Sequence, residues 1–132
     1  MANILIADDS PSIAGLLKMM IESSSDLEVI GIAENGQAAV EKNVALEPDI
    51  ITMDINMPVL GGLEALDKVM STRPCPVIII SSGSEEKDDY QVESIKQRGA
   101  VAVLDKPPAI GSDAFSRYSE ELIENIKKFS GC

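Results

Sequence analysis

The sequence predicts an α/β fold with a doubly wound, five-stranded parallel sheet. Five short apolar runs alternate along the chain with five segments whose apolar residues recur at helical spacing, which is the pattern of repeated strand–helix units. The runs are apolar over most of their length rather than alternating, as in strands that helices cover on both faces. The 132 residues match the size of one domain, so we expect a single three-layer domain over 1–132.

The strands are predicted from continuous apolar runs rather than from alternation. Each run is four to seven residues long and is followed by polar or turn-forming residues. The run Val-Ile-Ile-Ile that begins at Val77 is rich in β-branched residues and is the clearest of them. In chain order, the expected strands are 3–7, 27–33, 49–53, 77–80 and 100–104.

The helices are predicted from apolar residues spaced three and four apart, together with end signals. Ser10 and Pro11 supply an N-cap and a first turn. Asn35 opens the second helix, Pro48 ends it, and Gly61-Gly62 precedes the third. The fourth helix is more polar, and the fifth has one apolar side. In chain order, the expected helices are 13–21, 36–46, 63–70, 85–97 and 115–129.

The composition excludes several classes of function. Asp and Glu number 22 against 11 Lys and Arg, for a net charge of −11. A surface that acidic repels nucleic-acid phosphates and anionic lipid, and it suits a divalent cation or a basic patch on a partner protein. No apolar stretch is long enough to insert into a membrane. We therefore expect neither direct nucleic-acid binding nor membrane insertion.

The chain contains no histidine, which excludes Ser-His-Asp and Cys-His catalysis and histidine metal ligands. Its two cysteines, Cys75 and Cys132, are too few for a disulfide framework, and no secretory signal precedes the first apolar run. We expect a cytoplasmic protein with reduced thiols.

Polar side chains gather where the predicted strands end. Ligands of open α/β sheets bind beyond the carboxyl ends of the strands. Each of these residues alone is ordinary for a turn or a surface, but their occurrence at four strand ends favours a shared site. The residues at these ends are Asp8 and Asp9 after the first strand, Asp54 after the third, Ser81 after the fourth and Lys106 after the fifth.

Three carboxylates at one edge would repel one another unless a cation joined them. Two unit charges about 4 Å apart interact by roughly 4 kcal/mol at an effective dielectric constant of 20. Mg²⁺ binds a few carboxylate oxygens, keeps several waters and accepts a phosphate oxygen, and it would also offset charge on a transferred phosphoryl group. We therefore expect Mg²⁺ at Asp8 and Asp9.

The same residues suggest a phosphoryl-transfer chemistry. Asp54 stands alone at its strand end and is the expected nucleophile, forming an acyl phosphate. Lys106 would supply a cation to the phosphoryl oxygens or to Asp54. Ser81 would donate a hydrogen bond to the new phosphoryl group.

The motifs together resemble the receiver domain of two-component response regulators, in the CheY-like superfamily. The resemblance covers essentially the whole chain and implies a flavodoxin-like (βα)5 fold with strand order 2-1-3-4-5. The motifs that carry it are Ile6-Ala7-Asp8-Asp9-Ser10, Met53-Asp54-Ile55-Asn56-Met57-Pro58, Gly61-Gly62-Leu63, Ile80-Ser81-Ser82 and Lys106-Pro107.

The resemblance implies roles for individual residues. Asp54 matches the phosphoacceptor, and Asp8 and Asp9 match the acidic pair around Mg²⁺. Asp54 and Asn56 also match metal ligands, and Asn56 does so through its backbone carbonyl. Ser81 and Lys106 match the switch hydroxyl and the invariant lysine. The implied phosphodonor is a sensor histidine kinase, and the implied receiver of the signal is a downstream protein or an output domain.

Within receivers, the chain is most similar to those of chemotaxis methylesterase regulators, on segments such as Gly62-Leu63-Glu64-Ala65-Leu66. Those regulators carry an esterase domain, and we expect none within 1–132, so the chain would catalyse only its own phosphorylation and dephosphorylation. One departure is Val103, because receivers usually carry Tyr or Phe three residues before the lysine.

Four alternatives follow from the same residues. Val103 keeps open a degenerate receiver that binds partners without phosphorylation, and the chain could instead be the N-terminal part of a longer methylesterase regulator. A phosphohydrolase generally needs a second acid two residues after the nucleophile, where this chain has Asn56. A flavin or nucleotide site needs glycines and free amides where this chain has Asp8 and Asp9.

Overall fold

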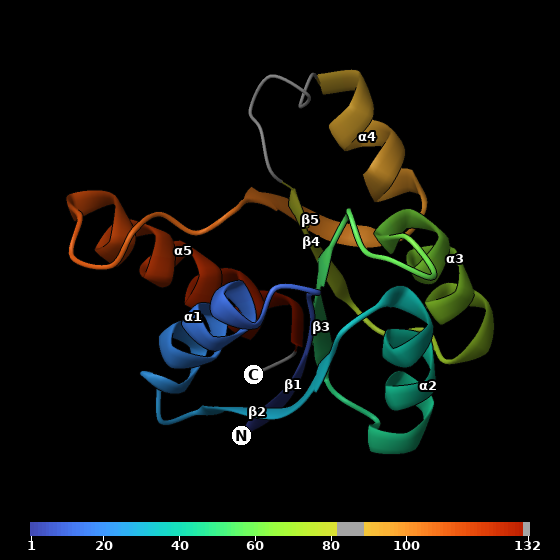
Figure 1. Ribbon diagram of the computed structural model, residues 1–132, viewed down its shortest axis with the longest axis horizontal. Coiled ribbons are helices and arrows are strands. Elements are labelled where there is room, and N and C mark those ends of the chain that lie inside the picture. Colours follow the sequence, from blue (N-terminus) through green and yellow to red (C-terminus); the bar gives the residue numbers. More distant parts are fainter. Residues whose placement is uncertain (82–88, 131–132) are drawn as a thin grey trace.

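A parallel sheet of five strands runs through the centre of the molecule in the order β2-β1-β3-β4-β5 (Figure 1). The computed structural model describes residues 1–81 and 89–130, apart from the side chains of residues 89–91. All four neighbouring strand pairs are parallel. The predicted fold class and strand order are confirmed. The strands are β1 (Ala2–Ala7), β2 (Leu27–Ala33), β3 (Ile50–Asp54), β4 (Val77–Ser81) and β5 (Ala100–Asp105).

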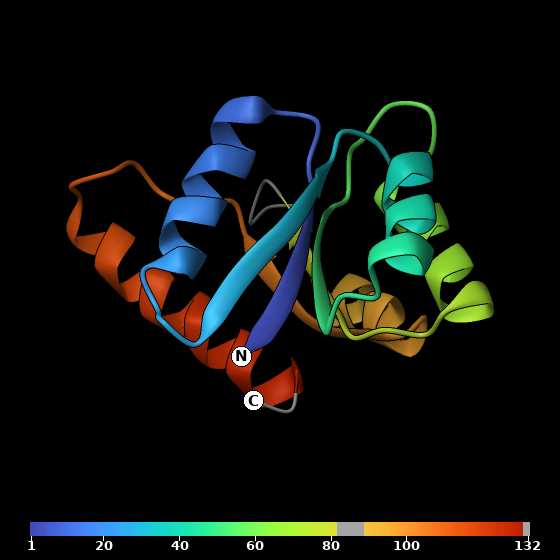
Figure 2. The same ribbon diagram turned by 90° about the horizontal axis from the view of Figure 1, so that it is seen from below.

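Five helices cover the two faces of the sheet (Figures 1 and 2). Helices α1 and α5 lie on one face, and α2, α3 and α4 lie on the other. Each layer has its own apolar cluster against the sheet, so the inner strands β1, β3 and β4 are buried on both sides as their continuous apolar runs predict. The helices are α1 (Pro11–Glu22), α2 (Gly36–Leu46), α3 (Gly62–Thr72), α4 (Asp89–Gln97) and α5 (Asp113–Ser130).

Helix starts and strand ends follow local sequence signals. The Ser10 hydroxyl accepts a hydrogen bond from the Ile13 amide at 3.3 Å, and the Asn35 side chain accepts one from the Ala38 amide at 2.8 Å. Both predicted N-caps are therefore confirmed. The fourth helix is described from Asp89, and the part of its predicted span at 85–88 lies outside the described residues.

The third strand extends one residue beyond its prediction. Asp54 was expected just past the strand, but it is the last residue of β3 and pairs opposite Ile80. The strand continues to Asp54 because backbone groups form its hydrogen bonds and a polar side chain does not prevent them. The Ile55 amide, for example, donates a hydrogen bond to the Ile80 carbonyl at 3.2 Å. Ser81 likewise ends β4 and pairs with Asp105. The side chains of Asp54 and Ser81 thus project from strand residues rather than from loops.

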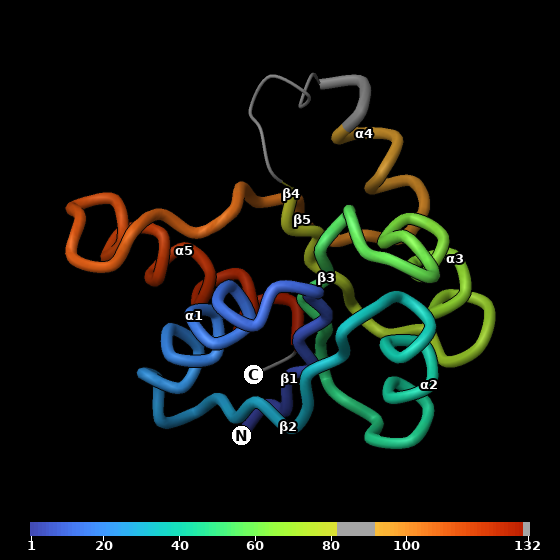
Figure 3. The backbone as a smooth tube through the Cα atoms, viewed as in Figure 1, coloured from blue at the N-terminus to red at the C-terminus, as the bar shows by residue number. Residues whose placement is uncertain are grey.

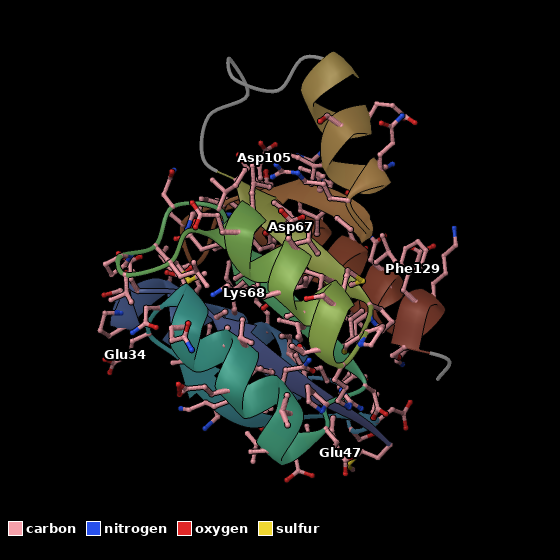
Figure 4. The ribbon with its side chains drawn as sticks, turned by 90° about the vertical axis from the view of Figure 1, so that its right-hand side faces the viewer. Glu34, Glu47, Asp67, Lys68, Asp105 and Phe129 are labelled. Atoms are coloured by element: carbon pink, nitrogen blue, oxygen red, sulfur yellow. The ribbon has the colours of Figure 1, made fainter. Side chains whose placement is uncertain are left out.

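Strand alternation directs the polar ends of β1 and β3 to the same face. Side chains two residues apart share a face, and Ile4, Ile6 and Ile50 pack in the cluster under α1 and α5. Asp8 and Asp54 therefore continue that face beyond the apolar core. The charged surface of the opposite layer points to solvent, as Asp67 and Lys68 on α3 show (Figure 4).

Side chains from two helices bind the backbone of the edge strand β2. The Glu22 carboxylate accepts a hydrogen bond from the Val29 amide at 3.3 Å. The Lys42 ammonium donates one to the Ile32 carbonyl at 2.6 Å. The edge strand is thus engaged from both layers of the molecule.

The connection from β5 to α5 extends away from the sheet. It spans 106–112 and swings outward beyond the sheet before α5 returns along it (Figure 3). Among the described helices, none combines the length and the apolarity needed to cross a bilayer.

Replacing Thr52 with valine is expected to stabilise the fold. Thr52 is fully buried in β3, and its hydroxyl has no hydrogen-bond partner among the described residues. Valine keeps the shape and removes the buried hydroxyl, so the free energy of unfolding should rise by about 1 kcal/mol. Urea denaturation measures the change. Thr52→Ser is the matched control and should lose stability, because it keeps the hydroxyl and gives up a buried methyl group. A less stable valine variant would contradict this account.

Candidate functional site

Three carboxylates converge beyond the ends of β1 and β3. Asp8, Asp9 and Asp54 each place a carboxylate oxygen within 4.8 Å of the others. Asp8 and Asp54 are only 2% and 4% exposed, whereas Asp9 is exposed to solvent. The convergence of these side chains, which the strand ends predict, is therefore present in the structure.

Lys106 joins the two buried carboxylates. Its Nζ lies 3.2 Å from Oδ2 of Asp8 and 3.1 Å from Oδ2 of Asp54. Lys106 begins the connection after β5, so the bridge ties the fifth strand to the first and the third. One ammonium among three carboxylates leaves two negative charges uncompensated, and a hard divalent cation would balance them.

Backbone amides orient the other oxygen of each buried carboxylate. Oδ1 of Asp8 accepts a hydrogen bond from the Ser10 amide at 2.9 Å. Oδ1 of Asp54 accepts one from the Asn56 amide at 3.2 Å. Each carboxylate therefore has one oxygen turned toward the chain that follows it and the other toward Lys106, so neither is free to rotate away.

Burial sets the protonation behaviour of Asp54. Loss of water raises the pKa of the Asp54 carboxyl above its ordinary value, and the nearby Asp8 charge adds to that effect. Lys106 and the Asn56 amide act in the opposite direction and limit the rise. Burial thus disfavours the ionised form of Asp54, and nearby positive charge is needed to stabilise it.

Residues 4–112 match the sequence profile of the family described as "Response regulator receiver domain". The chain belongs to this receiver family. A curated relative from Dechloromonas aromatica, a protein-glutamate methylesterase/protein-glutamine glutaminase, is 40% identical over 124 residues, which cover 94% of this chain. The match covers 35% of that relative. The receiver spans about a third of the length of the first curated relatives it matches.

Solved structures agree with this assignment. The response regulator domain of Thermotoga maritima CheB superposes with a TM-score of 0.86 at 39% identity, covering 100% of this receiver and 98% of that chain. A CheX-CheY-BeF3-Mg complex from Borrelia burgdorferi contains a chain that superposes with a TM-score of 0.79 at 25% identity. That match covers 96% of the receiver and 87% of the other chain.

Of two further residues predicted for the site, Ser81 lies next to a residue that pairs with Asp54, and Asn56 contacts Asp54. Ser81 is buried at the end of β4, next to Ile80, which pairs with Asp54. The backbone amide of Asn56 contacts Asp54, while its side chain is exposed. The expected roles of the Ser81 hydroxyl and the Asn56 carbonyl stay predictions. Val103 is half-buried on β5 and packs against the cluster under α2 and α3.

Gly62 is a part of the site that sequence reasoning missed. The sequence places it in a loop-to-helix turn, but the structure shows that α3 begins directly against the backbone of β3. A Cβ atom on Gly62 would lie 2.2 Å from the carbonyl oxygen of Asp54. Its amide also donates to the Ile55 carbonyl at 3.0 Å. Only a residue without a side chain fits there, and nothing in the local sequence shows which backbone it approaches.

Replacing Gly62 with alanine is expected to destabilise the receiver by about 2–3 kcal/mol, because rigid backbone must move to admit the methyl group. Gly15→Ala is the matched control. Gly15 is also helical, and a Cβ atom there would meet nothing within 4 Å, so the change should stabilise by about 0.5–1 kcal/mol. Urea denaturation of both variants measures the difference. Equal effects of the two substitutions would mean that α3 adjusts to the added group.

Proposed function

We propose that this receiver is a Mg²⁺-dependent phosphoryl acceptor of two-component signalling. Asp54 takes a phosphoryl group from a sensor histidine kinase, and the change is passed to a downstream protein or an output domain. The observation that carries the proposal is the Lys106 bridge between two buried carboxylates, with Asp9 within reach of both. A structural ion pair would need one carboxylate, whereas this arrangement gathers three.

The carboxylates fit a hard divalent cation. Asp8, Asp9 and Asp54 offer oxygens within 4.8 Å of one another, and the buried Asp54 lacks sufficient compensation from Lys106 alone. Receiver domains generally bind Mg²⁺ at an acidic pocket, so we assign these three residues and the backbone carbonyl of Asn56 as its ligands. When bound, Mg²⁺ supplies neutralisation of charge on phosphoryl oxygens.

The chain's own residues account for the transfer itself. An Asp54 oxygen forms a bond to phosphorus as the bond from phosphorus to the donor's histidine nitrogen breaks, and the nitrogen keeps the electron pair. Lys106 lies 3.1 Å from Asp54 and is placed to donate to a phosphoryl oxygen. The Ser81 hydroxyl would donate to another. Water later attacks the phosphorus, the bond between phosphorus and the Asp54 oxygen breaks, and inorganic phosphate leaves as the carboxylate is restored.

The receiver's relatives suggest how its output is connected. They are methylesterases of which the matching region forms about a third. In one form of the proposal, the receiver is the N-terminal part of such a regulator and acts on its output domain. In the other, it acts on a separate partner protein. Residues 1–132 form one receiver in this proposal and contain no esterase of their own. We place the protein in the cytoplasm, where kinases form phosphohistidine from ATP.

Phosphoryl uptake tests the proposal directly. The protein is incubated with phosphoramidate, a small phosphodonor, in Mg²⁺ or in EDTA, and its intact mass is measured over time. We expect one added phosphoryl group in Mg²⁺ and little or none in EDTA. A folded protein that gains no mass in Mg²⁺ would contradict the proposal and favour the degenerate receiver, for which Val103 is the specific observation.

A further inference from the structure

The position of Lys106 is set by the backbone on either side of it. On one side, Lys106 shares a planar peptide unit with the carbonyl of Asp105, the last residue of β5. On the other side is Pro107, which restricts the residue before it to extended backbone. Neither Pro107 nor Pro108 has an N–H to donate. Whatever holds the Asp105 carbonyl therefore directs the start of the lysine side chain.

Tyr118 of α5 holds that carbonyl. Its hydroxyl donates a hydrogen bond to the Asp105 oxygen at 2.5 Å. This hydrogen bond joins α5 to a strand, whereas the side chains of Ser119 and Asn125 bond within the helix and Lys127 reaches Asp26, outside the strands. Asp105 is labelled at the end of the sheet in Figure 4.

The surroundings keep the phenol a donor, with open space beside it. Burial raises the pKa of Tyr118, and the Asp105 and Glu121 carboxylates raise it further, so the hydroxyl remains protonated. Beside it lies a surface hollow of about 110 Å³, lined by Val103, Leu104, Asp105, Tyr118 and Glu121. The hollow thus lies between the end of β5 and the side chain of Tyr118 on α5.

We propose that Tyr118 is a positioning residue for Lys106, and that its hydroxyl couples α5 to the carboxylate site. The inference rests on the proposed phosphoryl transfer to Asp54. As Lys106 follows the new phosphoryl oxygens, the Asp105–Lys106 peptide plane turns and the Tyr118 hydrogen bond changes with it. Coupling of this kind is reciprocal, so a contact that moves the start of α5 also changes the placement of the lysine.

A double-mutant cycle in phosphorylation rate tests the inference. Tyr118→Phe keeps the ring and removes the hydroxyl, and it should slow phosphoryl uptake from phosphoramidate by about three- to tenfold, the value of one hydrogen bond. In a Lys106→Ala background the same change should have no further effect, because the residue through which it acts is gone. Ser119→Ala is the matched control: its hydroxyl bonds within α5, to the Phe115 carbonyl, and its loss should leave the rate unchanged.

Tyrosine resonances give a second measurement on the unaltered chain. With ¹³C-labelled tyrosine, the Tyr118 ring signals are those that remain in Tyr90→Phe, because the chain has only two tyrosines. They should shift on phosphorylation in the wild type and stay in place in a Lys106→Ala protein that intact mass shows to be phosphorylated to the same extent. If Tyr118→Phe fails to fold, this measurement decides. Signals that do not move, or equal slowing in both lysine backgrounds, would overturn the inference alone. A wild type that takes up no phosphoryl group would overturn the proposed function as well.

Discussion

Replacing Asp54 with asparagine is expected to abolish phosphoryl uptake and, in metal-free buffer, to stabilise the fold. The amide cannot form the acyl phosphate, so the added mass should disappear. The gain in stability has a separate cause. Asp54 is 4% exposed and shares one ammonium with Asp8, so its charge is only partly compensated. Removing a poorly compensated buried charge should raise the free energy of unfolding by about 1–2 kcal/mol.

The pH dependence of that gain follows from the direction of the pKa shift. Burial raises the pKa of Asp54 in the fold, so the folded chain holds this proton more tightly than the unfolded chain does. The wild type therefore loses stability as pH rises from the ordinary carboxyl pKa to the raised one, and it carries the full cost above that range. The advantage of Asp54→Asn should be greatest there and should vanish at lower pH.

Urea denaturation in EDTA at a series of pH values measures this, and intact mass measures uptake. Asp67→Asn is the matched control, because Asp67 is exposed on α3 and its ion pair with Arg98 spans 3.9 Å. It should keep phosphoryl uptake and change stability little. Uptake retained in Asp54→Asn would place the phosphoryl group on another residue. A gain that is the same at every pH would show that burial of the carboxylate is not its source.

Replacing Lys106 with alanine is expected to slow phosphoryl uptake by about a hundred- to thousandfold, the usual effect of removing one charge-stabilising donor. The ammonium lies 3.1–3.2 Å from both buried carboxylates, and among the described residues no other cation forms an ion pair with either of them. The same change should lower the free energy of unfolding in EDTA by about 1–3 kcal/mol, since two buried carboxylates lose their cation. Mg²⁺ should return part of that loss.

The initial rate of mass gain at fixed concentrations of phosphodonor and Mg²⁺ measures phosphoryl uptake. Urea denaturation with and without Mg²⁺ measures the free energy of unfolding. Lys68→Ala, which removes an exposed lysine from α3, is the control and should match the wild type in both. A Lys106→Ala protein with normal uptake would make the lysine a structural cation only.

The fold could be predicted because each element carries its own signal. Continuous apolar runs identify strands buried on both faces, and Ser10 and Asn35 mark helix starts by the hydrogen bonds their side chains accept. The site could be predicted as a group of residues, because parallel strands bring their carboxyl ends to one edge. Asp8, Asp9 and Asp54 needed no more than that rule to be placed together.

The remainder depends on contacts between distant segments. The Asp54 carbonyl leaves no room for a side chain at Gly62, and Tyr118 on α5 donates a hydrogen bond to the Asp105 carbonyl at the end of β5. No pattern in the neighbouring sequence indicates either contact. The extent of β3 was misjudged by one residue because polar side chains suggest a strand end, while backbone pairing with β4 continues to Asp54. Hydrophobic patterning indicates which residues are buried. Which backbone segments come into contact depends on how the layers pack against one another.

The side chains that bind β2 have a consequence for how molecules of this protein meet. An edge strand is a template on which another chain can assemble into a continuous intermolecular sheet. Here the Val29 amide and the Ile32 carbonyl are already occupied by a carboxylate and an ammonium from the protein's own helices. A second molecule would have to displace both charged groups before it could extend the sheet, so self-association into fibrils is opposed at this edge by the monomer itself.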